Sequence, residues 1–159
     1  MPAAPASMRC SSSFNGIPAD PQRNIIITPG SDSALFFSLI PFVEHGDEVM
    51  IVDPSYPNNF QAVEILGGVP VSVPVRPETG FELEIEEFER RLTDKTKLVI
   101  LTNPNNPTTV VYSRKSLEQL AAFIVKHDSR AIVDQAFEDI VYDGREMVSL
   151  GSLEGMLQK

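Results

Sequence analysis

Short apolar runs alternate along this chain with longer segments in which apolar residues recur every three or four positions. A short, continuous apolar run is typical of a strand buried on both faces, and the longer spacing is typical of a helix with one apolar face. Strands and helices that alternate in this way form a parallel sheet with crossover helices. The pattern predicts strands at residues 24–28, 48–53, 69–75, 98–102 and 131–134, and helices at residues 31–42, 58–66, 84–92 and 113–127.

This order of elements predicts the fold class: an α/β protein with three α/β/α layers and a mostly parallel sheet. The 159 residues are enough for one domain with a sizeable core. The N-terminal stretch is rich in Ala, Pro and Ser and carries no periodicity. We therefore expect residues 1–22 to be a disordered or remnant N-terminal segment and residues 23–159 to form the folded domain.

Charge and composition weigh against several kinds of partner. The net charge is −9, with 22 acidic and 13 basic residues, which disfavours nucleic acids and anionic membranes. The longest apolar run, at residues 34–43, is interrupted and too short to span a bilayer. The single Cys10 cannot form an internal disulfide, which favours a cytoplasmic location. His45 and His127 lie far apart with no cysteine near them, so we expect no metal site.

The most informative residues follow two of the predicted strands. Asn106 comes shortly after the apolar run at residues 98–101, and Asp134 directly follows the run at residues 131–133. Because one crossover helix joins two neighbouring parallel strands, both side chains should face one crevice. A carboxylate can hold a proton on a ring nitrogen and an amide can donate to a ring oxygen, so the pair suits a small heteroaromatic ligand. The alternative for Asp134 is a helix cap for the residues from Glu138 onward.

Two further segments suit other parts of such a ligand. The turn at residues 28–33 joins a strand to a helix, where free N–H groups and Gly30 would let the backbone approach a phosphate. The plainer interpretation of this turn is a capped helix start. Tyr56 follows the strand at residues 48–53, where an aromatic ring can stack on a flat ligand or pack on its neighbours as an ordinary turn residue.

These residues resemble the signatures of a known family. Asn-Pro-Asn-Asn-Pro-Thr-Thr at residues 103–109 and Asp-Gln-Ala-Phe at residues 134–137 are similar to N-P-x-N-P-T-G and D-x-x-Y of the fold-type I, pyridoxal-phosphate-dependent aminotransferases of class I/II. The resemblance covers most of the chain, from about residue 25 to residue 157. Three more segments match in the expected order, at residues 27–31, 46–49 and 53–57.

The resemblance implies the cofactor, the reaction and the roles of the candidate residues. The cofactor would be pyridoxal 5'-phosphate, with its phosphate on the turn at residues 28–33 and Tyr56 over one face of its ring. Asn106 would donate to the phenolic oxygen of the ring, and Asp134 would keep the ring nitrogen protonated. The intact parent would be a homodimer that transfers an amino group between an amino acid and a 2-oxo acid. The expected cofactor-binding residues are Gly30, Ser31, Asp32, Tyr56, Asn106 and Asp134.

The chain also departs from the family pattern. Thr109 stands in place of the signature glycine, and Phe137 stands where the family often has a tyrosine. The Schiff-base lysine of the family lies on a Ser-x-x-Lys segment, and no such segment follows Asp134, with Lys159 at the wrong distance. We therefore expect residues 23–159 to be a partial large domain that lacks the small domain and is inactive by itself. Two alternatives remain: a non-catalytic α/β module that binds a partner, and a fragment of a related pyridoxal-phosphate decarboxylase or lyase.

Overall fold

A parallel four-stranded sheet forms the centre of the chain in the computed structural model, which describes residues 15–20 and 22–159. The strands lie in the order β2-β1-β3-β4, and every neighbouring pair is parallel. The parallel α/β architecture predicted from the apolar runs is therefore confirmed. The strands are β1 (Glu48–Asp53), β2 (Val69–Pro74), β3 (Thr96–Thr102) and β4 (Arg130–Asp134).

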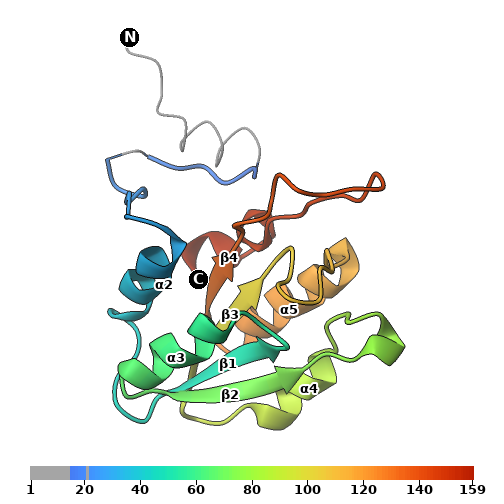
Figure 1. The fold of residues 1–159 in the computed structure, drawn as a ribbon. Helices are drawn as coiled ribbons and strands as arrows, with labels where there is room; N and C mark the ends of the chain where they lie inside the picture. The colour runs from blue at the N-terminus through green and yellow to red at the C-terminus, as the bar shows by residue number, and fades with distance from the viewer. Residues whose placement is uncertain (1–14, 21) are drawn as a thin grey trace.

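Helices cover both faces of this sheet and complete the three predicted layers (Figure 1). The helices are α2 (Ser31–Leu39), α3 (Pro57–Ile65), α4 (Ile85–Arg91) and α5 (Arg114–Lys126). Helices α2 and α3 pack on one face, and α4 and α5 pack on the other. One short 3-10 turn precedes α4 at Pro77–Thr79, and two more follow β4 at Leu150–Ser152 and Met156–Gln158.

Local sequence signals set several of the helix ends. The hydroxyl of Ser113 caps α5 by accepting a hydrogen bond from the backbone N–H of Ser116. Pro57 occupies the first turn of α3, where a missing N–H costs nothing. Gly67 follows α3 with a φ of 82°, a left-handed conformation that glycine adopts without a steric penalty. Helices α3 and α5 therefore begin or end close to where their terminal residues predict.

The alternation of side chains along each strand divides the core into two apolar clusters. In β1, Val49 and Ile51 pack against α2 and α3, whereas Met50 and Val52 pack against α4 and α5. All four side chains are inaccessible to solvent. Burial on both faces explains why β1 reads as a continuous apolar run rather than an alternating one.

The predicted strand at residues 24–28 is wrong. These residues form a turn and an extended segment with no strand assignment. Ile26 and Ile27 are 84% and 80% exposed, and the described sheet offers them no neighbouring strand. A run of β-branched residues favours an extended backbone, but a strand also needs a hydrogen-bonded partner.

The described part of the N-terminal segment contacts the C-terminal third of the chain. The amide of Asn15 donates to a carboxylate oxygen of Glu138 at 3.0 Å. Gly16 lies near the side chain of Ser152, and Ile17 lies against Gly151. The division at residue 22 stays a prediction, and residues 1–14 and 21 lie outside the described residues.

The connections between the strands create a switch point between β1 and β3. From β1 the chain crosses over α3 to reach β2 on one side, and from β3 it crosses over α5 to reach β4 on the other side. Because α3 and α5 cover opposite faces, the loops that leave β1 and β3 diverge. In open α/β sheets, ligands bind in the crevice that such a divergence leaves at the carboxyl ends of the strands.

A charged cluster on α4 holds one carboxylate out of solvent. The residue Glu87 is 3% exposed and accepts a hydrogen bond from Arg76 at 2.8 Å. Arg90 and Arg91 also pair with it from the next turn of the helix. The hydrogen bonds from Arg76 and Arg91 lower the pKa of Glu87 from 4.5 to about 2.

This depressed pKa predicts a specific acid sensitivity. A carboxylate whose folded-state pKa lies below its unfolded value stabilises the fold above pH 4.5 and loses that contribution as the pH falls toward 2. Urea denaturation should show that the free energy of unfolding of the wild-type chain falls between pH 5 and pH 2. The same measurement on Glu87→Gln should show a smaller fall. Glu86→Gln, an exposed neighbour on α4, is the matched control and should follow the wild-type curve. Identical slopes for all three chains would contradict the assignment.

Candidate active site

The candidate site lies at the carboxyl ends of β1, β3 and β4. Asp134 is the last residue of β4 and pairs in register with Thr102, the last residue of β3. The backbone N–H of Asn103 donates to the carbonyl of Asp134 at 2.9 Å, which extends the ladder by one bond. The loop that carries Asn106 therefore leaves the sheet directly beside Asp134.

The carboxylate of Asp134 is half-buried and partly engaged. Its Oδ1 accepts a hydrogen bond from the backbone N–H of Ala136 at 3.0 Å. The residues that follow form turns rather than a helix, so Asp134 does not act as a helix cap. The Oδ2 atom accepts no hydrogen bond from the described residues, which leaves one oxygen available to a ligand.

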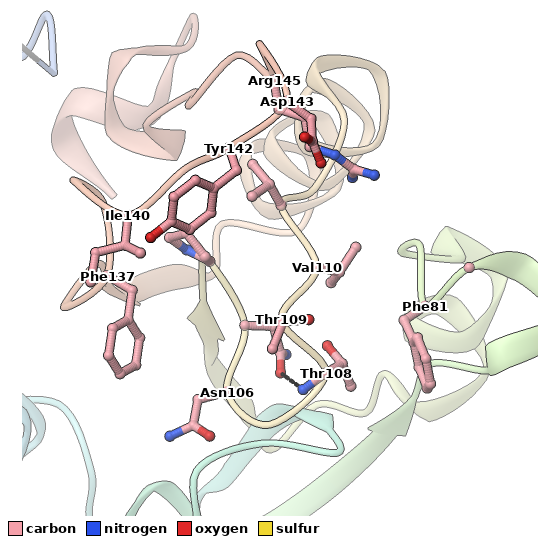
Figure 2. Close-up of a pocket in the computed structure, with 14 residues that line it drawn as sticks. Phe81, Asn106, Thr108, Thr109, Val110, Phe137, Ile140, Tyr142, Asp143 and Arg145 are labelled. Atoms are coloured by element: carbon pink, nitrogen blue, oxygen red, sulfur yellow. Dashed lines mark hydrogen bonds between the residues drawn. The ribbon is translucent and has the colours of Figure 1, made fainter.

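Asn106 lies on the loop between β3 and α5, beside a cavity of about 590 Å³. In Figure 2 this loop runs between Phe81 on one side and Phe137 on the other. The side chain of Asn106 makes no hydrogen bond with the described residues, so its donors are free. Of the six predicted site residues, Asn106 is the one that lines this cavity.

Tyr56 follows β1 and occupies the residue before α3. The ring is half-buried, and its hydroxyl accepts a hydrogen bond from the amide of Asn58 at 3.2 Å. This bond fixes the hydroxyl end of the ring and does not involve either face of the ring. Tyr56 and Asn106 thus stand on the two loops that flank the switch point.

The turn before α2 presents an open helix start. Gly30 has φ 92° and ψ 165°, and no heavy atom lies within 4 Å of the position that a Cβ would take. Thr28 and Ser33 use their hydroxyls on backbone carbonyls of the turn itself. The first N–H groups of any helix lack intrahelical partners, so this exposed turn can bind an anion. Ser31 and Asp32 are exposed here, and an anion would require the Asp32 carboxylate to face solvent.

Helix α2 packs against β4, and in Figure 1 the chain enters α2 near the arrowhead of β4. The turn and Asp134 therefore lie toward the same end of the sheet.

A group of buried polar residues lies beneath these loops, and the sequence pattern does not reveal it. Asn59 and Asn105 are 0% and 2% exposed. Asn59 on α3 donates to Thr102 at the end of β3, and Asn105 on the loop after β3 donates to the carbonyl of Pro54 on the loop after β1. Asn103 accepts a hydrogen bond from the N–H of Tyr112 at 3.2 Å and donates to the carbonyl of Val148 at 3.3 Å. The three asparagines of the signature run have different tasks. Burial separates Asn103 and Asn105 from Asn106, and different hydrogen-bond partners separate Asn103 from Asn105.

Burial also changes the chemistry of the tyrosine in this group. Tyr112 is 1% exposed, and removal from water raises the pKa of its phenol above the ordinary value. A hydrogen bond from Asn105 partly opposes this shift. The hydroxyl of Tyr112 is therefore neutral at physiological pH and available for hydrogen bonding.

Thr109, which replaces the signature glycine, has a φ of 60°. A β-branched residue in this conformation stores about 1–3 kcal/mol of strain. We expect Thr109→Gly to raise the free energy of unfolding by about 1 kcal/mol, after the entropic cost of glycine of about 0.5–1 kcal/mol. Thr108→Gly is the matched control, because Thr108 has a negative φ, and it should lower stability. Urea denaturation measures both, and a destabilising Thr109→Gly would refute the assigned strain.

The described residues offer neither a membrane span nor a metal site. No described helix combines the length and the apolar character needed to cross a bilayer. In the same part of the chain, no group of three His, Cys, Asp or Glu side chains is arranged to hold a metal ion.

Comparison with known proteins gives consistent matches. Residues 6–157 match the family model of the class I and II aminotransferases. An aromatic-amino-acid aminotransferase from Thermococcus litoralis is 40% identical over 91% of the chain, and an aspartate aminotransferase from Pyrococcus abyssi is 38% identical over 91%. The crystal structure of an aromatic aminotransferase from Pyrococcus horikoshii superposes with a TM-score of 0.92 at 38% identity, over 95% of this chain and 40% of that one. The chain spans 37% of the length of both sequence relatives.

Proposed function

Because the chain belongs to the class I and II aminotransferase family, we propose that it forms the cofactor-binding core of an enzyme that moves an amino group between an amino acid and a 2-oxo acid. Members of this family depend on pyridoxal 5'-phosphate. When bound, this cofactor supplies an electron-withdrawing ring that stabilises a substrate carbanion. The observation that carries the proposal is the switch point between β1 and β3, whose flanking loops bear Tyr56 and Asn106.

The donor set fits the parts of this cofactor. The open space before Gly30 and the free N–H groups at the start of α2 suit a phosphate. The unengaged amide of Asn106 suits a phenolic oxygen, because it can donate without breaking an existing bond. The free Oδ2 of Asp134 suits a protonated ring nitrogen, since a carboxylate favours the charged form of its partner.

Each residue therefore has a distinct task in the proposed site. Asp134 holds a proton on the ring nitrogen, and Asn106 orients the ring through its oxygen. Tyr56 covers one face of the ring and excludes water from it. Gly30, Ser31 and Asp32 belong to the turn that anchors the phosphate, with the Asp32 carboxylate directed to solvent.

The activity, substrates and assembly of the whole protein are part of the proposal. The parent acts on an amino acid and a 2-oxo acid and works as a homodimer in the cytoplasm. Residues 23–159 supply part of its large domain. The 159 residues contain no Ser-x-x-Lys segment after Asp134. We therefore propose that this chain by itself binds the cofactor but does not catalyse transamination.

Titration with pyridoxamine 5'-phosphate tests the proposed site. This probe carries an amine in place of the aldehyde, so it cannot react with lysines and reports non-covalent binding alone. We expect a dissociation constant on the millimolar scale, which corresponds to a binding free energy of about −4 kcal/mol. Backbone amide signals of Ser31, Tyr56, Asn106 and Gln135 should shift together in a two-dimensional NMR spectrum.

Pyridoxamine without its phosphate is the matched ligand control and should bind at least about tenfold more weakly, because it lacks the anion that the helix start attracts. Shifts confined to other surfaces would contradict the proposed site. The absence of any shift would favour the alternative of a partner-binding module.

A further inference from the structure

Two buried asparagines cross the switch point beneath the proposed site, and they differ in what they connect. Asn59 lies on α3 and donates to Ser55 at 2.8 Å and to Thr102 at 3.2 Å. It ties the loop after β1 to the end of the strand β3. Asn105 lies on the loop after β3 and donates to the carbonyl of Pro54 at 3.3 Å. It ties the same loop to the segment that carries Asn106.

Both polar atoms of the Asn105 side chain are engaged in hydrogen bonds. Its amide nitrogen donates to Pro54 and also to the hydroxyl of Tyr112 at 2.9 Å. Its amide oxygen accepts from the backbone N–H of Thr108 at 3.4 Å, drawn as a dashed line in Figure 2. An amide has two donors and one acceptor oxygen, so every polar atom of this side chain has a partner.

The backbone of Asn105 is fixed as firmly as its side chain. Its N–H donates to the carbonyl of Val110 at 2.8 Å, and its carbonyl accepts from the N–H of Thr109 at 2.9 Å. These two bonds close the loop across its base. The peptide that leads into Asn106 is therefore held from both sides, while the side chain of Asn106 stays free.

Asn105 contacts the segments of both proposed ligand-facing residues. Pro54 is two residues before Tyr56, and Asn105 directly precedes Asn106. A buried amide with three partners has one low-energy orientation, because each lost bond leaves a desolvated polar group. A shift of the loop after β1 would thus be transmitted to the loop after β3.

We propose that Asn105 is a positioning residue that sets Tyr56 and Asn106 at a fixed separation across the switch point, so that a flat ring fits between the stacking face and the amide donor. The proposal rests on the proposed function for its ligand. The coupling of the two loops is a property of the ligand-free chain, and it can be measured there.

Asn105→Asp tests the coupling with nearly unchanged shape. The aspartate keeps the acceptor for Thr108 and can accept from Tyr112, but it replaces the donor that faces the carbonyl of Pro54 with an oxygen. We expect the amide signals of both Tyr56 and Asn106 to shift in the ligand-free chain. Signals of Val69 and Val71, which lie toward the amino end of β2 and away from these loops, should stay in place.

Ser55→Ala is the matched control, because it removes a bond from Asn59 in the same loop and leaves the bonds of Asn105 intact. It should change the signal of the adjacent Tyr56 only through the local loss of the hydroxyl, without displacing the loop, and should therefore leave the signal of Asn106 unchanged. Tyr112→Phe is a milder second variant that preserves the volume of a buried side chain and removes one partner of Asn105. It should shift the signals of both Asn106 and Tyr56, so the proposal can be tested even if Asn105→Asp fails to fold.

Affinity for pyridoxamine 5'-phosphate provides the second measurement. We expect Asn105→Asp to bind it about tenfold more weakly than the wild type, and Ser55→Ala to stay within about threefold. Unchanged affinity in Asn105→Asp, or an Asn106 signal that moves without that of Tyr56, would overturn the positioning role. If the wild-type chain binds no probe, the proposed function fails, while the ligand-free spectra still decide whether Asn105 couples the two loops.

Discussion

Replacing Asp134 with alanine is expected to weaken the binding of pyridoxamine 5'-phosphate by roughly tenfold to a hundredfold. A hydrogen bond between a carboxylate and a protonated ring nitrogen contributes about 1.5–3 kcal/mol, and each 1.4 kcal/mol is about tenfold in affinity. The free Oδ2 of Asp134 is the atom that would make this contact. NMR titration of the wild type and the variant measures the difference.

Asp134→Asn is the matched control for this prediction. It keeps the shape of the side chain and an oxygen that can accept from the N–H of Ala136, but it removes the charge. If charge is what binds the ring, the asparagine variant should resemble the alanine variant in affinity while it retains wild-type stability. Wild-type affinity in Asp134→Asn would remove the proposed role of the carboxylate.

The second large effect that we expect is an absence of catalysis by the 159-residue chain. Transamination in this family needs a lysine near the ring, and positioning cannot substitute for a missing nucleophile. Lys159 is the one lysine after Asp134, and its ammonium pairs with Asp128 before the start of β4. Asp134 lies at the opposite end of that strand, roughly 13 Å or more away at about 3.3 Å per residue.

An assay with a panel of amino donors and 2-oxoglutarate, in a preparation free of host transaminases, should therefore give no turnover above the blank. Borohydride reduction of the chain with pyridoxal 5'-phosphate should label no single lysine preferentially in the mass spectrum. Stoichiometric labelling of Lys159 would show that the pair with Asp128 opens and that another arrangement of the site exists. The lysines at the start of β3, Lys95 and Lys97, provide an internal comparison for non-specific labelling.

Much of this fold could be predicted from the sequence because short apolar runs mark most of its strands locally. The apolar run of β1 marks a strand at residues 48–53, and the structure has those bounds. The predicted helix at residues 113–127 differs from α5 by only one residue at each end. The prediction is close because the ends of this helix are set by capping groups next to them in sequence. The signature run at residues 103–109 identified the family for the same reason, and the comparisons bear this out.

Other features depended on partners far away in sequence. Residues 24–28 have the composition of a strand, yet no described strand lies beside them, and Ile26 and Ile27 stay exposed. Phe137 stands at a signature position, but the structure directs it to the margin of a cavity with 42% of its surface exposed. Neither outcome follows from local pattern, because both depend on which segments pack nearby.

The sequence by itself determined the alternation of strands and helices. With it came the layers, the carboxyl edge, the loops that carry Tyr56 and Asn106, and the strand end that carries Asp134. The tertiary structure alone decided the tasks of the neighbouring asparagines in residues 103–106. Asn105 is buried and satisfied by Pro54 on another loop, whereas Asn106 next to it stays unengaged. Two identical side chains differ in this way because burial and long-range hydrogen bonds are properties of the packed chain, which residue type and spacing do not encode.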